Sequence, residues 1–287
     1  MNTVSLTLTN EEINKMITSF SDEIVKSNNP YIKYQIKTLD CVISIYTSNK
    51  AVFQGKDAHI YAAAFINKEN RMAGSDEVGT GDYFGPVCVC ACIVEKEDYP
   101  LLKELKVDDS KKIDDEKILN IAPILMNKLK YSLLILDNPK YNRAHDEYNL
   151  NQIKAKLHNQ AYINLLHKGY DIPKACYVDQ FEPKEAYFKH LYHEKEIYHD
   201  LSFETKAESK YIAVAAASII ARYAFIKSIE KMEAHYNVKL SKGASDIVDK
   251  DAYDFCLKYG FNRLNEVAKI HFKNTFKVQE LLSKNHQ

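Results

Sequence analysis

Residues 74–86 read GSDEVGTGDYFGP and set two adjacent carboxylates, Asp76 and Glu77, among four glycines. Adjacent carboxylates repel each other, and a glycine-rich loop gives them little shielding. The glycine spacing, G-x-G-x-x-x-G, differs from the G-x-G-x-x-G of dinucleotide-binding loops, and no Walker lysine follows. The acidic pair would also repel the phosphate oxygens of a nucleotide. A divalent cation that takes hard oxygen ligands, Mg²⁺ or Mn²⁺, suits this stretch better.

The composition of the chain is that of a globular protein. Its 287 residues suffice for two domains or one large one, and 39 basic residues balance 39 acidic ones. Six cysteines include no CxxC pair, and three of them alternate in VCVCAC on one face of a predicted strand. We interpret the cysteines as reduced, buried side chains. The N-terminus does not resemble a signal peptide, and the most apolar segment, Ile212–Ala221, is shorter than a membrane span of ~20 residues. We therefore expect a cytoplasmic protein without a membrane partner, and a monomer by default.

Residues 1–66 have the pattern of a small N-terminal domain that combines a helix with an antiparallel sheet. Apolar side chains at helical spacing predict a helix over 9–27, with Thr9 or Asn10 as its N-cap. The alternation in YIKYQIKT and the apolar runs after it predict strands near 31–37, 41–47 and 52–53.

The predicted N-terminal sheet is basic. Between residues 24 and 56, five lysines that include Lys33 and Lys37 stand against Asp40 alone, which makes a local net charge of five minus one, or +4. Lysines on strands, interleaved with Tyr31, suit a surface that binds nucleic acid. The alternative is an ordinary solvated face of the sheet.

The pattern changes after the polar linker NKENR. From residue 71 to 287, predicted strands alternate with predicted helices, which indicates an α/β domain with a mixed sheet. We expect strands at 71–76, 86–94, 131–137, 175–179 and 201–206, and helices near 113–129, 151–168, 184–193, 209–235 and 246–259.

Two further carboxylates stand where a metal site could recruit them. Asp179 ends the apolar run CYVDQF, where a carboxylate is costly unless it is exposed or bound. Glu208 precedes a long helix rich in alanine, where it could instead complement the helix dipole. Taken alone, each of these residues is more often structural than catalytic. Four converging carboxylates, however, are what a phosphodiester hydrolase that uses two metal ions needs.

Four ordered segments resemble the type 2 ribonuclease H family, and within it the ribonuclease HIII branch. GSDEVGTGDYFGP resembles the family signature, VDDSKKI at 107–113 is similar to its Asp-Ser-Lys segment, and YVDQF and TKAESKYIAVAAASIIARYAF resemble the strand and the segment that carry its third and fourth acids. KGAS at 242–245 resembles a later loop of the family. The resemblance covers about residues 71–260 and leaves 246–287 without an assigned role.

The resemblance implies a fold, an activity and a set of site residues. The fold is an RNase-H-like mixed sheet flanked by helices, with a small N-terminal α+β domain like the TATA-binding protein. The activity is endonucleolytic hydrolysis of the RNA strand of RNA–DNA hybrids, which leaves a 3′-hydroxyl and a 5′-phosphate. The four metal ligands fall on Asp76, Glu77, Asp179 and Glu208, with two Mg²⁺ or Mn²⁺ ions. The implied substrate contacts are Gly79, Thr80 and Gly81 toward 2′-hydroxyls, Lys111 and Lys206 toward phosphates, Ser110, Ser209 and Ser245 as hydrogen-bond partners, and Lys33 and Lys37 on the N-terminal sheet.

Three features favour ribonuclease HIII over its sister, ribonuclease HII. The loop reads Gly-Thr-Gly where ribonuclease HII usually has Gly-Arg-Gly, the fourth acid is Glu208 where ribonuclease HII usually has Asp, and the chain has the extra N-terminal unit. Two alternatives stay open at this point. One is a ribonuclease HII-like activity at single ribonucleotides embedded in duplex DNA, and the other is a non-catalytic module that binds hybrids.

Overall fold

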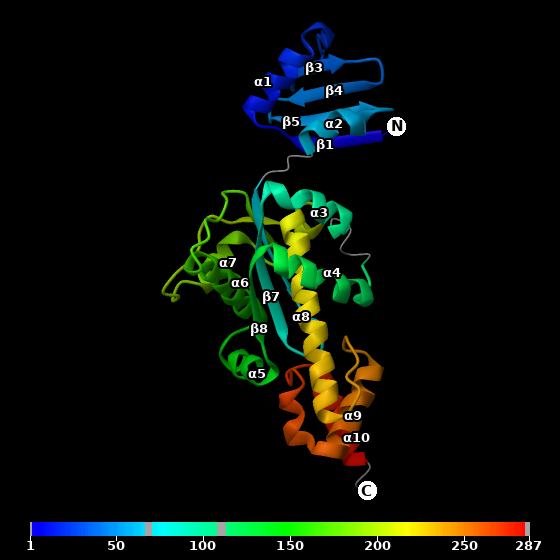
Figure 1. Cartoon of the computed structure of the whole chain (residues 1–287), viewed down its shortest axis with the longest axis vertical. Coiled ribbons are helices and arrows are strands. Elements are labelled where there is room, and N and C mark those ends of the chain that lie inside the picture. The colour runs from blue at the N-terminus through cyan, green and yellow to red at the C-terminus, as the bar shows by residue number, and fades with distance from the viewer. Residues whose placement is uncertain (1, 67–70, 108–112, 285–287) are drawn as a thin grey trace. The chain divides into compact units, whose positions relative to one another are not determined.

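The computed structural model describes residues 2–66, 71–107 and 113–284. The chain divides into two compact units, Met1–Asn70 and Arg71–Gln287, which Figure 1 shows and which we describe one at a time.

The N-terminal unit is one antiparallel sheet with two helices. Its strands follow the order β1-β5-β4-β3-β2. The apolar faces of the helices and of the central strands share one small core, which includes Ile13, Met16, Ile43 and Phe53. The elements are β1 (Asn2–Thr7), α1 (Asn10–Ser19), the 3-10 turn η1 (Ser21–Glu23), β2 (Ile24–Val25), β3 (Ile32–Lys37), β4 (Cys41–Tyr46), β5 (Lys50–Gly55) and α2 (Ala58–Ile66).

The first predicted helix is shorter than its periodicity suggested. Thr9, one of the two residues predicted as the N-cap, caps this helix and forms a capping box with Glu12. The helix ends at Ser19, and the predicted continuation to residue 27 is wrong because Ile24 and Val25 pair with β3 instead. Tertiary strand pairing therefore overrides helical spacing in this segment. The sequence pattern also missed β1 and α2.

The second unit is built on a mixed five-stranded sheet in the order β10-β9-β6-β7-β8. β6, β7 and β8 form an antiparallel meander, whereas β9 runs parallel to β6 and β10 runs parallel to β9. The predicted α/β class is confirmed. The elements are β6 (Met72–Val78), β7 (Val87–Val94), η2 (Lys96–Asp98), α3 (Tyr99–Glu104), α4 (Asp115–Lys128), β8 (Lys130–Leu136), α5 (Asn138–Glu147), α6 (Leu150–His167), β9 (Cys176–Asp179), α7 (Lys184–His190), β10 (Ser202–Glu204), η4 (Ala207–Ser209), α8 (Ile212–Tyr236), α9 (Asp246–Tyr259), η5 (Phe261–Glu266) and α10 (Lys273–Lys284).

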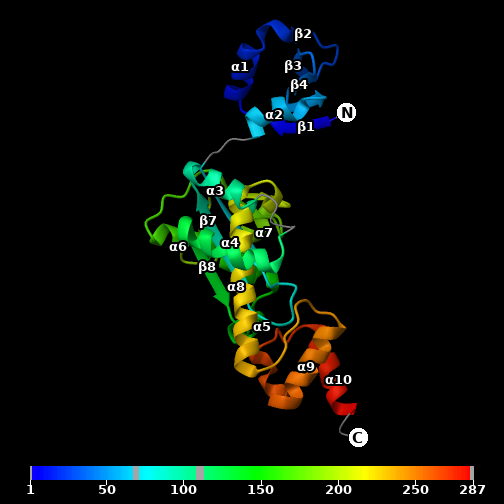
Figure 2. The same cartoon turned by 45° about the vertical axis from the view of Figure 1, so that its right-hand side comes forward.

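Strand β7 is buried on both faces and separates two hydrophobic cores. Its alternating cysteines, Cys88, Cys90 and Cys92, lie in the core that α4 and α8 cover, as the VCVCAC pattern predicted. The residues between them, such as Val89, lie in the core beneath α6 and α7. Figures 1 and 2 show α8 crossing the sheet on one side, with α6 and α7 on the other. All six cysteines are buried and unpaired.

Helix α8 approaches the sheet closely because the facing residues are small. A side chain at Gly74 of β6 would place its Cβ 2.5 Å from the backbone nitrogen of Val214, so only glycine fits there. The apolar segment expected over 212–221 belongs to this longer helix, Ile212–Tyr236, which is long and apolar enough by composition to cross a membrane. However, 67% of its most apolar window is buried inside the protein, as in the core helix of a folded domain.

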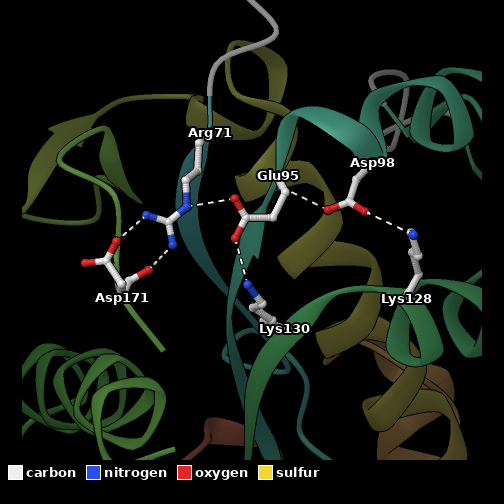
Figure 3. A network of polar contacts seen from close by, with 6 residues as sticks. All are labelled: Arg71, Glu95, Asp98, Lys128, Lys130 and Asp171. Atoms are coloured by element: carbon white, nitrogen blue, oxygen red, sulfur yellow. Dashed lines mark hydrogen bonds and ion pairs between the residues drawn. The ribbon is translucent and has the colours of Figure 1, made fainter. Parts of the chain in front are cut away.

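A polar network joins the start of β6 to neighbouring strands (Figure 3). Arg71 donates from Nε to Glu95 (2.7 Å) and from Nη1 to Asp171 (2.6 Å), and Lys130 pairs with the other oxygen of Glu95 at 2.9 Å. Asp98 accepts the backbone N–H of Glu95. Because Arg71, Glu95, Asp171 and Lys130 are all at least partly exposed, each of these three ion pairs contributes about 1 kcal/mol or less to stability. The network fixes the edge of the sheet at which β6 begins.

Candidate active site and metal centre

Strands β6 and β9 bring the first and third predicted carboxylates to the same edge of the sheet. Ser75 of β6 is level with Val178 of β9, and the two strands are parallel. The next residues along each strand, Asp76 and Asp179, therefore lie side by side near the carboxyl ends of the two parallel strands. The fourth residue follows from the neighbouring strand: after β10 the chain turns at Lys206, and Glu208 lies in η4 at the start of α8.

The electrostatics show that these four carboxylates are neighbours. Burial, which is the largest cause, and the charges of Glu77 and Asp179 together raise the pKa of Asp76 to about 8, although hydrogen bonds from Ser218 and the Glu77 backbone lower it. Burial also raises the pKa of Asp179, as do Glu208 and Glu77, while the backbone N–H of Ala207 donates to its Oδ1 at 2.7 Å and lowers it. Without bound cations, the four carboxylates together carry more negative charge than their buried surroundings favour.

Asp76 and Glu77 are less exposed than a glycine-rich loop would make them. They belong to β6, where Asp76 is 9% exposed and the side chain of Glu77 is 11% exposed, so the expectation of little shielding is wrong. Successive side chains on a strand point to opposite faces. Asp76 accordingly meets Ser218 of α8, whereas Glu77 faces α6. The strand itself separates the two charges.

Two residues of α6 that the sequence analysis missed hold Glu77. Lys154 Nζ lies 2.5 Å from Glu77 Oε1, and His158 Nε2 lies 2.8 Å from Oε2. His158 is fully buried, and its Nδ1 atom lies 2.7 Å from Ser75 Oγ, so the ring bridges Ser75 and Glu77. Lys154 also lies 3.9 Å from the ring centre of Phe181.

These contacts keep Glu77 ionised. Burial alone would raise its pKa, but the hydrogen bond and charge of His158 and the charge of Lys154 outweigh burial, so the pKa of Glu77 is lowered. The one sequence signal for the two partners was their spacing. Residues four apart on a predicted helix share a face, and here a lysine and a histidine do so on an otherwise apolar face.

The donor set fits hard divalent cations. Four carboxylates supply only oxygen ligands, which Mg²⁺ and Mn²⁺ prefer, and the raised pKa values of Asp76 and Asp179 indicate a site that lacks positive charge. Among the residues that the structure describes, no three His, Cys, Asp or Glu side chains are already gathered around one point. Glu77 is turned toward Lys154 and His158, so ion binding requires this carboxylate to share its oxygens or to rotate.

In the loop that follows β6, the backbone conformation requires glycine at position 79 but not at position 81. Gly79 has φ +95°, and a Cβ there would lie 2.2 Å from the carbonyl oxygen of Pro86. Gly81 has no atom within 4 Å of the place where its Cβ would stand, and its φ is one that other residues adopt. The fold explains the first glycine but gives no reason for the second. Thr80 lies between them in the turn.

The other predicted contacts are scattered. Lys206 has a left-handed φ of 56° beside Glu208, and Ser209 Oγ donates to the Lys206 carbonyl at 2.8 Å. Ser245 is the N-cap of α9. Ser110 and Lys111 lie outside the described residues. Lys33 and Lys37 belong to the N-terminal unit, where both are exposed on β3, with a β-bulge between Ile32 and Tyr34.

Comparisons with known proteins cover almost the whole chain. The ribonuclease HII family model matches residues 73–275, and a domain family of unknown function (DUF3378) matches residues 3–77. The chain is 38% identical to a ribonuclease HIII of Streptococcus pneumoniae strain CGSP14 over 97% of its own length and 99% of that protein. This chain belongs to the ribonuclease HIII family. Membership makes it a metal-dependent endoribonuclease of the ribonuclease H type.

Solved structures lead to the same family. The crystal structure of Bst-RNase HIII in complex with Mn²⁺ matches with a TM-score of 0.75 and 32% identity, over 99% of this chain and 100% of that one. The structure of Aquifex aeolicus RNase H3 matches with a TM-score of 0.57 and 25% identity, over 94% and 100%. Both matches extend over nearly the whole of this chain, and the first protein was crystallised in complex with Mn²⁺.

Proposed function

We propose that Asp76, Glu77, Asp179 and Glu208 hold two divalent ions, Mg²⁺ or Mn²⁺, with which this ribonuclease HIII cuts the RNA strand of RNA–DNA hybrids. One observation carries the assignment of residues: β6 and β9 deliver carboxylates to the same edge of the sheet, where burial and mutual repulsion raise their pKa values. When bound, the ions would activate the attacking water and stabilise the leaving oxygen, which yields a 3′-hydroxyl and a 5′-phosphate.

Some side chains of this site would bind the ions, and others orient the carboxylates that do. Asp76 and Asp179 are fixed by backbone hydrogen bonds, from Glu77 N–H and Ala207 N–H, so they present their remaining oxygens to ions in set directions. Lys154 and His158 keep Glu77 charged until a cation arrives. Such outer partners usually matter to metal affinity as well as to position.

Recognition of the hybrid rests on the loop after β6 and on the N-terminal sheet. The Gly79-Thr80-Gly81 backbone would lie in the minor groove and meet 2′-hydroxyls, which distinguish RNA from DNA. The open space at Gly81 supports this role, because nothing in the fold itself fills it. Lys33 and Lys37 are exposed on β3 and would contact phosphates.

Gel-resolved cleavage in Mg²⁺ by the purified protein tests this proposal. The two substrates are an RNA–DNA hybrid and duplex DNA that contains one ribonucleotide. We expect cuts at many sites in the hybrid and none in the second substrate. Efficient cutting 5′ to the single ribonucleotide would instead establish a ribonuclease HII-like specificity, and an uncut hybrid would leave only a binding role.

We also propose that the enzyme works in the cytoplasm as a monomer. Six unpaired, buried cysteines suit a reducing compartment, in which thiols persist. Sedimentation of the purified chain would test the monomer, and a dimer at micromolar concentration would contradict it.

A further inference from the structure

The C-terminal part of the second unit returns to the loop that follows β6, residues 79–86, which we call the glycine loop. Phe84 and Ala268 form an isolated antiparallel bridge. Gly85 N–H donates to the carbonyl of Val267 at 3.0 Å, and the backbone N–H of Lys269 donates to the carbonyl of Tyr83 at 2.8 Å. A segment nearly two hundred residues later in the chain therefore runs alongside the end of the loop that starts at Gly79.

Lys269 extends this contact with its side chain. The residue is fully buried, and its Nζ donates to the carbonyl oxygens of Asp82, at 2.8 Å, and Gly85. The Gly85 carbonyl also accepts from the Asn138 side chain at 2.9 Å. Among the ion pairs of the described residues, none includes Lys269, so its ammonium group is held by neutral carbonyls.

Burying the charge of such a lysine destabilises the folded state. Burial lowers the pKa of Lys269 to about 7, and the charge of Asp82 opposes that shift only partly. An apolar residue of similar length would fill the same space without the desolvation cost of a charge. A structural role alone therefore explains Lys269 poorly, whereas fixing two carbonyls of one loop explains it directly.

A second pair of hydrogen bonds fixes the same stretch of the loop. The backbone N–H of Gly243 donates to Asp82 Oδ1 at 2.6 Å, and Tyr83 N–H donates to the Gly243 carbonyl at 2.9 Å. Gly243 belongs to the KGAS segment, in which the sequence analysis gave a role to Ser245 alone. Residues 82–85 are thus held by the C-terminal part of the unit on both sides, while Gly81 just before them stays open.

We infer that Lys269 is a positioning residue that fixes residues 82–85 and thereby presents the backbone of Gly79–Gly81 to the RNA strand. The inference rests on the proposed role of that loop in substrate recognition. Lys269 acts through the loop, and the ions and the scissile phosphate need not touch it. Loss of its two hydrogen bonds should weaken hybrid binding and leave the chemical step intact.

The test is Lys269→Met, which keeps the length of the side chain and removes its charge and donors. We expect the KM for hybrid to rise about tenfold, with kcat within about twofold and thermal stability equal or higher. Lys258→Met is the matched control. Lys258 also donates to two carbonyls, those of Tyr236 and Asn237, but it is exposed and contacts no part of the loop.

An unchanged KM in a folded Lys269→Met protein would overturn the inference, whether or not kcat falls. If that variant does not fold, Asp82→Ala decides, because Asp82 is only partly buried: a KM equal to that of the wild type would refute loop positioning. Hybrid affinity measured by fluorescence anisotropy in EDTA separates the two proposals. Should the wild type bind hybrid but not cut it, the proposed activity fails, while a weaker Kd of Lys269→Met would still support the loop's role.

Discussion

Gly81→Ala should separate the folding requirement of the glycine loop from its role in substrate binding. No atom lies within 4 Å of the added Cβ, and the backbone of Gly81 is not left-handed. The substitution also restricts the unfolded chain. We therefore expect the free energy of unfolding to stay the same or to rise by about 0.4–1 kcal/mol.

The cost should appear in binding instead. If the loop backbone lies against the RNA strand, a methyl group at Gly81 holds the two apart and breaks one or two hydrogen bonds. Leaving such groups unpaired costs about 1–3 kcal/mol, which corresponds to a roughly 5- to 150-fold weaker Kd for hybrid. Gly79→Ala provides the contrast. Its φ of +95° and its 2.2 Å approach to Pro86 should cost at least about 2 kcal/mol of stability, or a Tm lower by about 4–8 °C.

Thermal unfolding and anisotropy titrations with labelled hybrid in EDTA measure both effects on the same samples. The reasoning fails if Gly81→Ala binds hybrid as tightly as the wild type, because the loop would then not approach the substrate. It also fails if Gly81→Ala loses as much stability as Gly79→Ala, since the space around Gly81 would then not be open.

Three further predictions concern the carboxylates and the N-terminal unit. Asp179→Asn should abolish cleavage while hybrid binding persists; simultaneous loss of binding would mean that Asp179 maintains the fold. The pKa of Asp76 is raised to about 8 in the folded, ion-free protein, so ionisation of this carboxyl lowers the free energy of unfolding progressively as pH rises from about 4 to 8. Asp76→Asn should therefore raise Tm at pH 8 in EDTA. The same substitution should abolish the Tm gain from Mn²⁺. Lower stability of Asp76→Asn under those conditions would refute the assigned repulsion. Deletion of residues 1–66 should raise KM more than it lowers kcat, and Lys33→Ala with Lys37→Ala should reduce the salt dependence of binding; an unchanged KM would exclude hybrid binding by this unit.

Much of the fold could be read from local patterns. The strands of the second unit begin and end within about two residues of their predicted bounds, because each is an apolar run with turn residues beside it. The elements that were missed are of a different kind. Helix α2 is apolar on nearly all sides and α5 is largely polar, so neither shows the one-sided pattern that identifies a surface helix.

The sequence by itself determined the chemistry of this protein: four carboxylates in ordered motifs, the glycine loop and the alternating cysteines, since these depend only on residue type and short spacing. The tertiary structure decided which groups meet. Parallel pairing of β6 with β9 brings Asp179 beside Asp76, and α6 places Lys154 and His158 on Glu77. The return of the chain at Lys269 fixes the glycine loop. Contacts between residues so far apart in the chain follow from the register of strands and the packing of helices, which no local spacing encodes.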